Sequence, residues 1–308
     1  MSDRIPFRVH PMLASLVPKP FHQAGWVYEE KYDGYRILAY KEGAKVTLLS
    51  RNNLDRTATF AAVATAVAQL RERTALLDGE VVAFDAKRVS RFQLLQRGDV
   101  AQAFAVFDCI YRGGRDLRRE PLSRRRDELE SVLEKSPKQL LISRRLAKDG
   151  LAAYDIAKRK GFEGIVAKDS ASPYEERRSR KWLKVKAHQE EEFVIGGFTA
   201  PEGSREHLGA LLLGAYDGKD LHFVGKVGTG FTEKTLAALA KTFRPLVATR
   251  PPFVDPPREK STTWLAPRLV AQIAFQEWTA DRKLRQPVFL GLRDDKKAAD
   301  CLLPKNFS

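Results

Sequence analysis

The sequence predicts an α+β protein of two domains, one covering residues 1–188 and the other residues 189–308. The length of 308 residues suits about two domains. Strand-like and helix-like segments are mixed as far as residue 188, whereas the later segments are mostly strand-like and separated by Gly and Asp turns. Hydrophobic residues make up 43% of the chain, which is enough to build real cores.

The first domain is predicted to begin with short strands and to continue with a mixture of helices and strands. Apolar runs between polar breaks indicate strands, and alanine-rich or amphipathic runs indicate helices. One strand is expected to be interrupted by the polar run Asp78-Gly79-Glu80. The predicted strands are residues 27–30, 36–40, 45–49, 76–84, 103–111, 161–168 and 182–186, and the predicted helices are residues 60–70, 122–134 and 150–160.

The second domain is predicted to be a small barrel. A meander of three strands comes first, then a helix and a Pro-rich loop, then two more strands. Five strands with one helix after the third is the pattern of an OB-fold, which often binds nucleic acid. The predicted strands are residues 193–198, 208–216, 221–226, 269–278 and 288–290, with the helix at 233–242 and the loop at 245–257.

Composition predicts a cytoplasmic protein, expected in the bacterial cytosol or nucleoid. The N-terminal residues are polar, and no run approaches the ~18 apolar residues of a membrane helix. The two cysteines, Cys109 and Cys301, are far apart, which favours a disulfide-free cytosolic protein and argues against structural zinc. We expect a monomer without a membrane partner.

The strong positive charge indicates a polyanionic partner. The net charge is +15 and the isoelectric point about 9.8, and nucleic acid is the commonest partner of such a chain. Ribosome-associated and membrane-surface proteins share this charge. Arginines crowd residues 112–126, where a solvated surface and phosphate contact are equally good interpretations, and a second basic cluster covers residues 177–186.

The most informative motif is Lys-x-Asp-Gly-x-Arg, which runs from Lys31 to Arg36. It is typical of enzymes that carry a nucleoside monophosphate on a lysine. A lysine attacks phosphorus only as the free amine, so its pKa must be lowered by nearby positive charge or burial. Gly34 is expected to let the backbone pass close to a ligand, and Arg36 to hold charged oxygens in a forked contact. The alternative is an ordinary strand, Asp-Gly turn and strand.

Further motifs follow Lys31 in order along the chain. Those that carry chemistry are Ser50-Arg51-Asn52, Leu77-Asp78-Gly79-Glu80, Ala105-Val106-Phe107-Asp108, the segment 162–168 of type Glu-Gly-apolar-apolar-x-Lys, the segment 181–186 with Lys184 and Lys186 on one strand face, and Arg293-Asp294-Asp295-Lys296. Others are Phe92-Gln93-Leu94-Leu95-Gln96, Pro121-Leu122, the segment 224–231, Glu277-Trp278-Thr279 and the segment 289–293.

Together these motifs resemble those of ATP-dependent DNA ligases of the covalent nucleotidyltransferase superfamily, most closely the ligase domain of bacterial ligase D and its stand-alone relatives. The resemblance covers nearly the whole chain. It implies that residues 1–188 form an ATP-grasp-like adenylation (nucleotidyltransferase) domain and that residues 189–308 form the OB-fold domain, which closes over ATP and then reorients to clamp DNA.

The resemblance also implies roles for residues around the nucleotide. Lys31 is the nucleophile that takes AMP, and Glu29, two residues earlier on the same strand face, accepts a hydrogen bond from the adenine N6 amine. Arg36 and Arg51 hold ribose or phosphate oxygens, and Phe107 stacks on adenine. The alternatives are an exposed strand carboxylate for Glu29, a surface loop arginine for Arg51 and an ordinary core residue for Phe107.

Further roles concern the metal and the phosphates. Glu163 binds a divalent cation, Mg²⁺ or Mn²⁺, and Glu80 holds the metal or the ribose; a turn carboxylate is the alternative for Glu80. Lys184 and Lys186 contact the α-phosphate. The cluster Arg293, Asp295 and Lys296 orients the leaving pyrophosphate; its alternative is a charged surface turn.

The expected function is sealing of nicks in duplex DNA, through a lysyl-AMP intermediate and an AMP-capped 5′-phosphate, in DNA repair or end joining. ATP is the expected cofactor, and a Ku-like end-binding protein is a candidate partner. The alternatives are an RNA ligase, a capping-type guanylyltransferase and a non-catalytic DNA-end-binding module. Glu29, as an acceptor for adenine N6, favours ATP over GTP. The choice of repair pathway, the choice of metal and the tolerance of RNA at the nick stay open.

Overall fold

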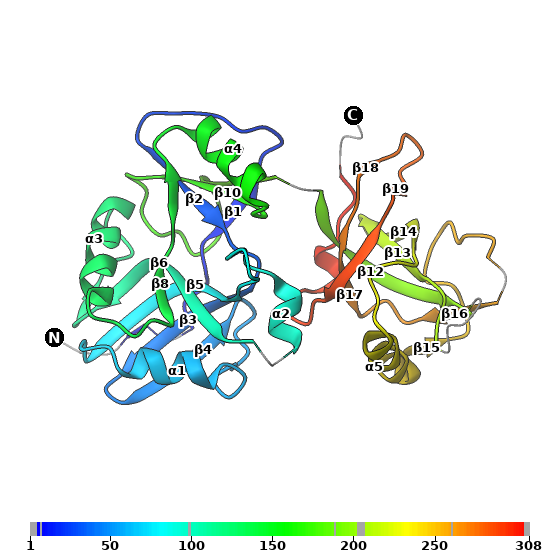
Figure 1. Ribbon diagram of the computed structural model, residues 1–308, viewed down its shortest axis with the longest axis horizontal. Helices are drawn as coiled ribbons and strands as arrows, with labels where there is room; N and C mark the ends of the chain where they lie inside the picture. Colours follow the sequence, from blue (N-terminus) through cyan, green and yellow to red (C-terminus); the bar gives the residue numbers. More distant parts are fainter. Residues whose placement is uncertain are drawn as a thin grey trace. The chain divides into compact units, whose positions relative to one another are not determined.

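A computed structural model describes residues 5–6, 8–97, 100–187, 189–201, 207–259 and 261–304, and its chain divides into two compact units, Met1–His188 and Gln189–Ser308 (Figure 1). Each unit has its own buried core. Within the described residues no helix is long and apolar enough to cross a membrane. The two cysteines are free and buried.

The first unit contains a five-stranded sheet in the order β1-β11-β10-β2-β9. Helix α4 (Gly150–Lys160) packs against one face through Ala153 and Ala157. Asp149 caps its first turn, and Gly161 ends it in the left-handed conformation, so the following strand begins at Gly164 instead of residue 161 as predicted. The strands are β1 (Leu13–Leu16), β2 (Trp26–Lys31), β9 (Arg145–Ala147), β10 (Gly164–Asp169) and β11 (Arg178–Lys186).

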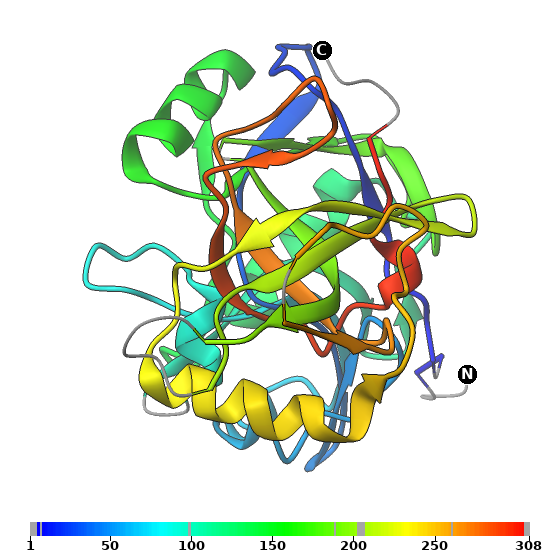
Figure 2. The ribbon, with the colours of Figure 1, turned by 90° about the vertical axis from the view of Figure 1, so that its right-hand side faces the viewer.

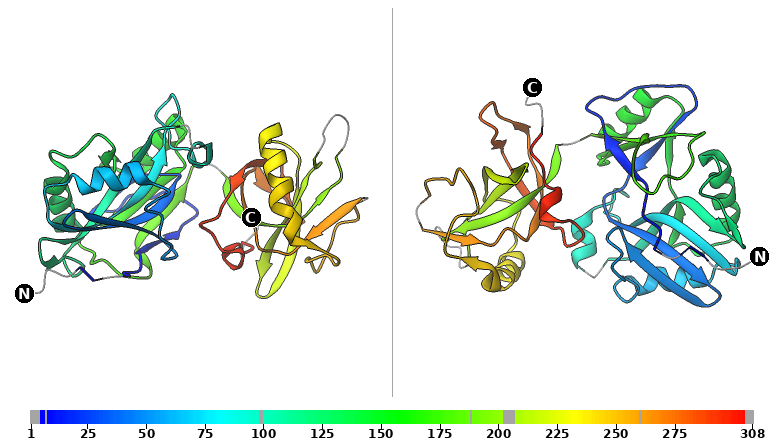
Figure 3. Two further views of the ribbon diagram at one scale, coloured as in Figure 1. Left: turned by 90° about the horizontal axis from the view of Figure 1, so that it is seen from below. Right: turned by 180° about the vertical axis from the view of Figure 1, so that it is seen from behind.

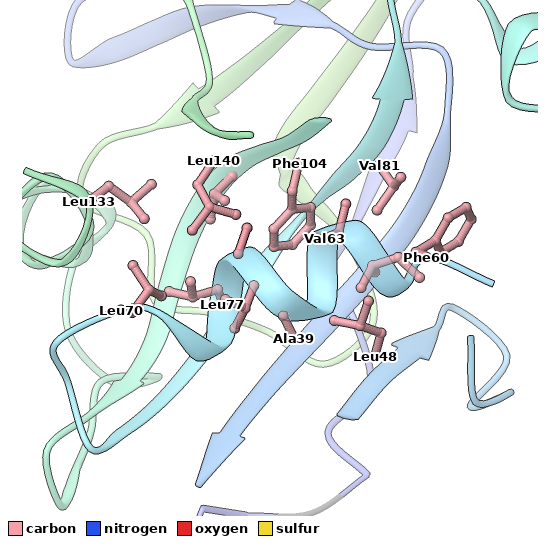
Figure 4. Packing of buried hydrophobic residues seen from close by; sticks show 14 of the residues in the cluster. Ala39, Leu48, Phe60, Val63, Leu70, Leu77, Val81, Phe104, Leu133 and Leu140 are labelled. Atoms are coloured by element: carbon pink, nitrogen blue, oxygen red, sulfur yellow. The ribbon is translucent and has the colours of Figure 1, made fainter. Parts of the chain in front are cut away.

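The second sheet of this unit has the order β4-β3-β5-β6-β7, and β8 pairs with β6. Figures 1 and 3 show α1 (Ala61–Ala68) lying along one face, where Val63 and Phe60 join the core drawn in Figure 4. The other face shares a cluster with Trp182 of the first sheet. The remaining elements are β3 (Tyr35–Glu42), β4 (Lys45–Ser50), β5 (Thr74–Ala83), α2 (Phe92–Arg97), β6 (Gln102–Arg112), β7 (Arg115–Asp116), α3 (Leu122–Leu133) and β8 (Leu140–Ile142).

Strand β5 is continuous, so the predicted interruption at residues 78–80 is wrong. Arg36, Ile37 and Leu38 of β3 pair in register with Glu80, Gly79 and Asp78. Asp78 is a buried strand residue, and its carboxylate accepts hydrogen bonds from Arg36 and the Tyr174 hydroxyl. Gly79 is required for packing, since a Cβ there would lie 2.6 Å from the Phe104 ring.

The second unit is built around β12 (Glu190–Thr199), which pairs with β13, β16 and β17 along its length. Figure 2 shows α5 (Glu233–Phe243, yellow to gold) beside this sheet; Thr232 caps its first turn. The other elements are β13 (Leu211–Asp217), β14 (Asp220–Val227), η1 (Arg244–Leu246), β15 (Val247–Ala248), β16 (Thr262–Leu265), β17 (Val270–Ala274), β18 (Glu277–Trp278), β19 (Leu284–Arg285), β20 (Val288–Leu292) and η2 (Ala298–Asp300).

Two predictions for this unit need correction. The strand predicted at residues 269–278 is two strands, β17 and β18, separated at Phe275 and Gln276. The Pro-rich loop contains η1 and the short strand β15, which pairs with the unpredicted strand β16. The order of the long strands, with one helix after the third, is otherwise as predicted.

Gly79→Ala is expected to destabilise the first unit by roughly 1–3 kcal/mol, because the added methyl group overpacks the contact with Phe104. Urea unfolding followed by tryptophan fluorescence measures the change. Gly228→Ala is a matched control, since a Cβ there lies 3.8 Å from its nearest neighbour. Equal stability of the two variants would contradict this account of β5.

Candidate active site

Three neighbouring strands place the candidate catalytic residues on one sheet face. In the register of β2, β10 and β11, Lys31 lies opposite Gly164, and Gly164 lies opposite Lys186. Glu29 and Lys184 are joined in the same way through Val166. Because side chains alternate along a strand, these four charged residues share a face. The opposite face carries apolar residues packed against α4, namely Tyr28, Ile165, Ala167 and Val185.

Gly164 and Gly34 are needed for close packing of the backbone around this face. Gly164 has a φ of +156°, and a Cβ there would lie 2.1 Å from the Val185 carbonyl oxygen. A Cβ on Gly34 would lie 2.2 Å from the carbonyl oxygen of Val81. The sequence assigned Gly34 to a close approach of a ligand. In the structure it permits close approach of the neighbouring strand β5.

Lys31, the last residue of β2, forms an ion pair with Glu163. The two side chains are 17% and 12% exposed, so the pair is largely shielded from water. Burial lowers the pKa of Lys31, but the charges of Glu163, Asp33 and Glu80 more than offset this effect, and the net pKa lies above that of an ordinary lysine. The expectation of a lowered pKa is therefore wrong for this state, in which Lys31 is held as an ammonium ion.

Glu29 is a buried carboxylate, so the alternative of an exposed strand residue is wrong. Its Oε2 atom accepts hydrogen bonds from Lys168 Nζ and Ser143 Oγ, both at 2.7 Å. Its Oε1 atom accepts one from Arg126 Nη1 at 3.2 Å. Glu29 is thus fixed by donors from three different parts of the first unit.

Phe107 lies in an aromatic and cationic cluster and is 8% exposed. The guanidinium carbon of Arg36 and the ammonium nitrogen of Lys168 each lie 4.4 Å from its ring centroid. The Trp182 ring meets Phe107 edge-on, with centroids 6.0 Å apart. Phe107 therefore belongs to the core and also borders the buried cations; its stacking on adenine stays a prediction.

Arg36 makes its forked contact with a residue of the protein. Its Nε and Nη2 atoms donate to the two oxygens of Asp78 at 2.5 and 2.7 Å, and Nη2 also donates to the Met12 carbonyl. Asp78 accepts a further hydrogen bond from Tyr174 at 2.6 Å. Arg36 thus holds the charged oxygens of Asp78 in its fork, and its contact with a ribose or phosphate oxygen stays a prediction.

Arg51 and Glu80 belong to the second sheet and the segment that follows it. Arg51 follows the end of β4 and is partly buried. Glu80 stands opposite Arg36 in the register of β3 and β5, and its charge acts on Lys31. Because β5 is continuous, Glu80 is a strand residue and the alternative of a turn carboxylate is wrong.

The C-terminal motif is built into the second unit. The Nε and Nη2 atoms of Arg293 donate to Asp295 at 2.8 and 2.9 Å, and Nη1 donates to Gln272 at 2.9 Å. Lys296 pairs with Glu192 at 3.1 Å. Arg293 and Asp295 are each 8% exposed, so the alternative of a charged surface turn is wrong for them. Pyrophosphate orientation by this motif stays a prediction.

The sequence did not single out Lys168, Arg126, Ser143 or Asp78 as site residues. Lys168 is the last residue of the motif that contains Glu163, and this position could have identified it as a site residue. Arg126 was hidden among neighbouring arginines, and nothing in the sequence distinguishes a buried Ser143. Partners of this kind lie far apart in the chain, so only the fold reveals them.

The residues present fit a magnesium or manganese ion. Glu163 and Glu80 both act electrostatically on Lys31 and are only partly buried. In the described ranges no group of three or more His, Cys, Asp and Glu residues could hold a metal by itself. Mg²⁺ usually takes one or two carboxylates and completes its shell with substrate phosphates and water.

Two family models match the chain, and they follow its two units. The ATP dependent DNA ligase domain matches residues 11–186, and the ATP dependent DNA ligase C terminal region matches residues 204–296. The chain is 38% identical over 309 residues to the multifunctional non-homologous end joining protein LigD of Pseudomonas aeruginosa, covering 96% of this chain and 36% of that protein. It is 33% identical to a DNA ligase of Thermococcus fumicolans, covering 87% of this chain and 52% of that protein.

Solved structures agree with these relatives. A mycobacterial DNA ligase D complexed with ATP and MES is 34% identical, with a TM-score of 0.76, and covers 97% of this chain and 100% of that one. The ligase domain of LigD from Mycobacterium tuberculosis is 35% identical, with a TM-score of 0.55, over 97% and 99% of the two chains. The chain belongs to the ATP-dependent DNA ligase family, which confirms an adenylation domain followed by an OB-fold domain. It spans about a third of the length of its LigD relatives.

Replacing Glu163 by Gln is expected to lower the pKa of Lys31, because burial is then opposed only by Asp33 and Glu80. NMR titration of the Lys31 ammonium signal, assigned with Lys31→Arg, measures this shift. Because the pKa of the folded state is raised, the ion pair stabilises the fold below the ordinary pKa of lysine and loses this effect as the pH rises through the folded value. Asp169→Asn, which removes the partner of exposed Lys181, is the control. A pKa of Lys31 that is unchanged in Glu163→Gln would contradict the assignment.

Proposed function

We propose that this chain is an ATP-dependent DNA ligase that seals nicks in duplex DNA. The observation that carries the proposal is the common sheet face of Lys31, Lys184 and Lys186, with Glu163 against the nucleophile. One amine, one carboxylate and two further cations side by side suit transfer of a nucleotidyl group.

In the first step Lys31 Nζ attacks the α-phosphorus of ATP, so that a P–N bond forms and the bond to pyrophosphate breaks. Lys31 must lose a proton first, and Glu163, its ion-pair partner, is the nearest carboxylate to assist. Lys184 and Lys186 stabilise the negative charge that develops on the phosphate oxygens. Arg293 and Lys296 of the second unit orient the pyrophosphate.

A divalent metal ion held by Glu163 and Glu80 would neutralise phosphate charge when bound. Glu163 is also the main interaction that raises the pKa of Lys31, whereas burial lowers that pKa.

In the later steps AMP moves from Lys31 to the 5′-phosphate at the nick, and the 3′-hydroxyl then attacks that phosphate and expels AMP. The net charge of +15 supports binding to the DNA backbone without sequence preference. The name of the LigD relatives supports a role in end joining, with a Ku-like protein as a candidate partner. We expect a cytoplasmic monomer.

Lys31→Ala and Lys31→Arg are expected to abolish the covalent AMP adduct, because neither residue supplies a neutral amine. Incubation with ATP labelled at the α-phosphate, followed by a denaturing gel, measures the adduct. Lys181→Ala removes an exposed lysine from β11 and should retain it. A normal yield of the AMP adduct in Lys31→Ala would contradict the proposal.

Lys296→Ala should impair adduct formation by at least tenfold but leave sealing of a pre-adenylated nick almost unchanged, because the β- and γ-phosphates are absent from that substrate. Glu163→Ala should impair both reactions, since the metal stabilises charge in each. Lys296 is a cleaner probe than Arg293, whose removal would leave Asp295 buried without its partner. Equal defects of the two variants on the pre-adenylated nick would exclude the pyrophosphate role.

A further inference from the structure

The buried carboxylate of Glu29 is held by a network that the ligase reaction itself does not explain. Arg126 comes from α3, Ser143 from the segment after β8, and Lys168 from β10. Their contacts with Glu29 measure 3.2, 2.7 and 2.7 Å. All four residues are buried, with exposed fractions between 2% and 6%.

Arg126 is itself held in place by hydrogen bonds to residues other than Glu29. Its Nη1 atom also donates to Ser143 Oγ at 3.0 Å, and Nη2 donates to the Ser143 carbonyl at 2.9 Å. Its Nε atom donates to Glu130 at 3.0 Å. Two hydrogen bonds thus join Arg126 to Ser143. Together these residues contact both oxygens of Glu29. A rotation of the Glu29 carboxylate would break contacts to both residues.

The network leaves Glu29 able to accept one further hydrogen bond. An ionised carboxylate has about four acceptor positions and no donor. Lys168 and Ser143 use two positions on Oε2, and Arg126 uses one on Oε1. A cation contacts each oxygen, and the remaining acceptor position of the carboxylate lies on Oε1.

An acceptor fixed in this way distinguishes purine bases. Adenine presents an amine donor at position 6, whereas guanine presents a carbonyl acceptor there, which a carboxylate oxygen repels. We infer that Arg126 and Ser143 are positioning residues that set the preference of the enzyme for ATP over GTP by fixing Oε1 of Glu29 toward the 6-amino group. The inference rests on the proposed adenylation of Lys31.

The test compares ATP with purine riboside triphosphate, which lacks the 6-amino group. Rates of covalent adduct formation are measured with each nucleotide for wild type, Arg126→Ala and Ser143→Ala. Hydrogen bonds to charged groups predict a roughly tenfold or greater loss of kcat/KM for ATP in each variant, with less than about a twofold change for the analogue. Discrimination against GTP should fall in parallel.

Conservative and control variants separate positioning from general stability. Ser143→Thr retains the hydroxyl group and should restore most of the preference for ATP over the analogue. Arg124→Ala removes a neighbouring arginine of α3 whose side chain is 56% exposed, and should leave both nucleotides unaffected. Lys168 is unsuitable as a probe because its removal would also disturb its contacts with Phe107 and Trp182.

The outcomes distinguish this inference from the proposed function. Absence of any adduct in the wild-type protein would overturn the proposed function and the inference together. A normal wild-type adduct with equal losses for ATP and the analogue in Ser143→Ala would overturn the inference alone. If Arg126→Ala fails to fold, Ser143→Ala and Ser143→Thr decide the matter, because the first only removes one hydroxyl group and the second only adds one methyl group.

Discussion

The structure of the first unit depends on ion pairs that join buried or half-buried cations to carboxylates. Lys31 pairs with Glu163, Arg36 with Asp78, and Arg125 with Asp108, while Lys168 and Arg126 share Glu29. Leaving one member of such a pair uncompensated costs about 3–5 kcal/mol. The pairs join elements that are distant in sequence, and those of Arg125 and Arg126 connect α3 to both sheets.

The pairing also determines the protonation state of Lys31. Glu163 raises the pKa of Lys31 and opposes the effect of burial. The amine is therefore held as an ammonium ion in its pair with Glu163. The neighbouring pairs have different effects. Asp78 holds Arg36 beside Phe107. The donors around Glu29 leave its carboxylate one acceptor position.

The sequence predicted the long elements well, because hydrophobic periodicity is a local property. Its motifs also pointed to Lys31, Lys184 and Lys186, which the structure brings to one sheet face. It failed at β5, where an Asp-Gly pair that usually turns the chain is held in a strand by Arg36 and Tyr174. It also missed short strands such as β8 and β16, whose few residues carry no periodic signal. The direction of the pKa shift of Lys31 and the donors around Glu29 depend on long-range contacts, which no local pattern records.

The central claim is that Lys31 carries AMP between ATP and DNA. The most direct measurement is peptide mapping by mass spectrometry of wild-type protein incubated with ATP, before and after addition of nicked duplex DNA without further ATP. The account predicts AMP on the peptide that contains Lys31, and loss of that AMP together with appearance of a sealed strand. AMP on a different residue, or an adduct on Lys31 that nicked DNA does not discharge, would contradict it.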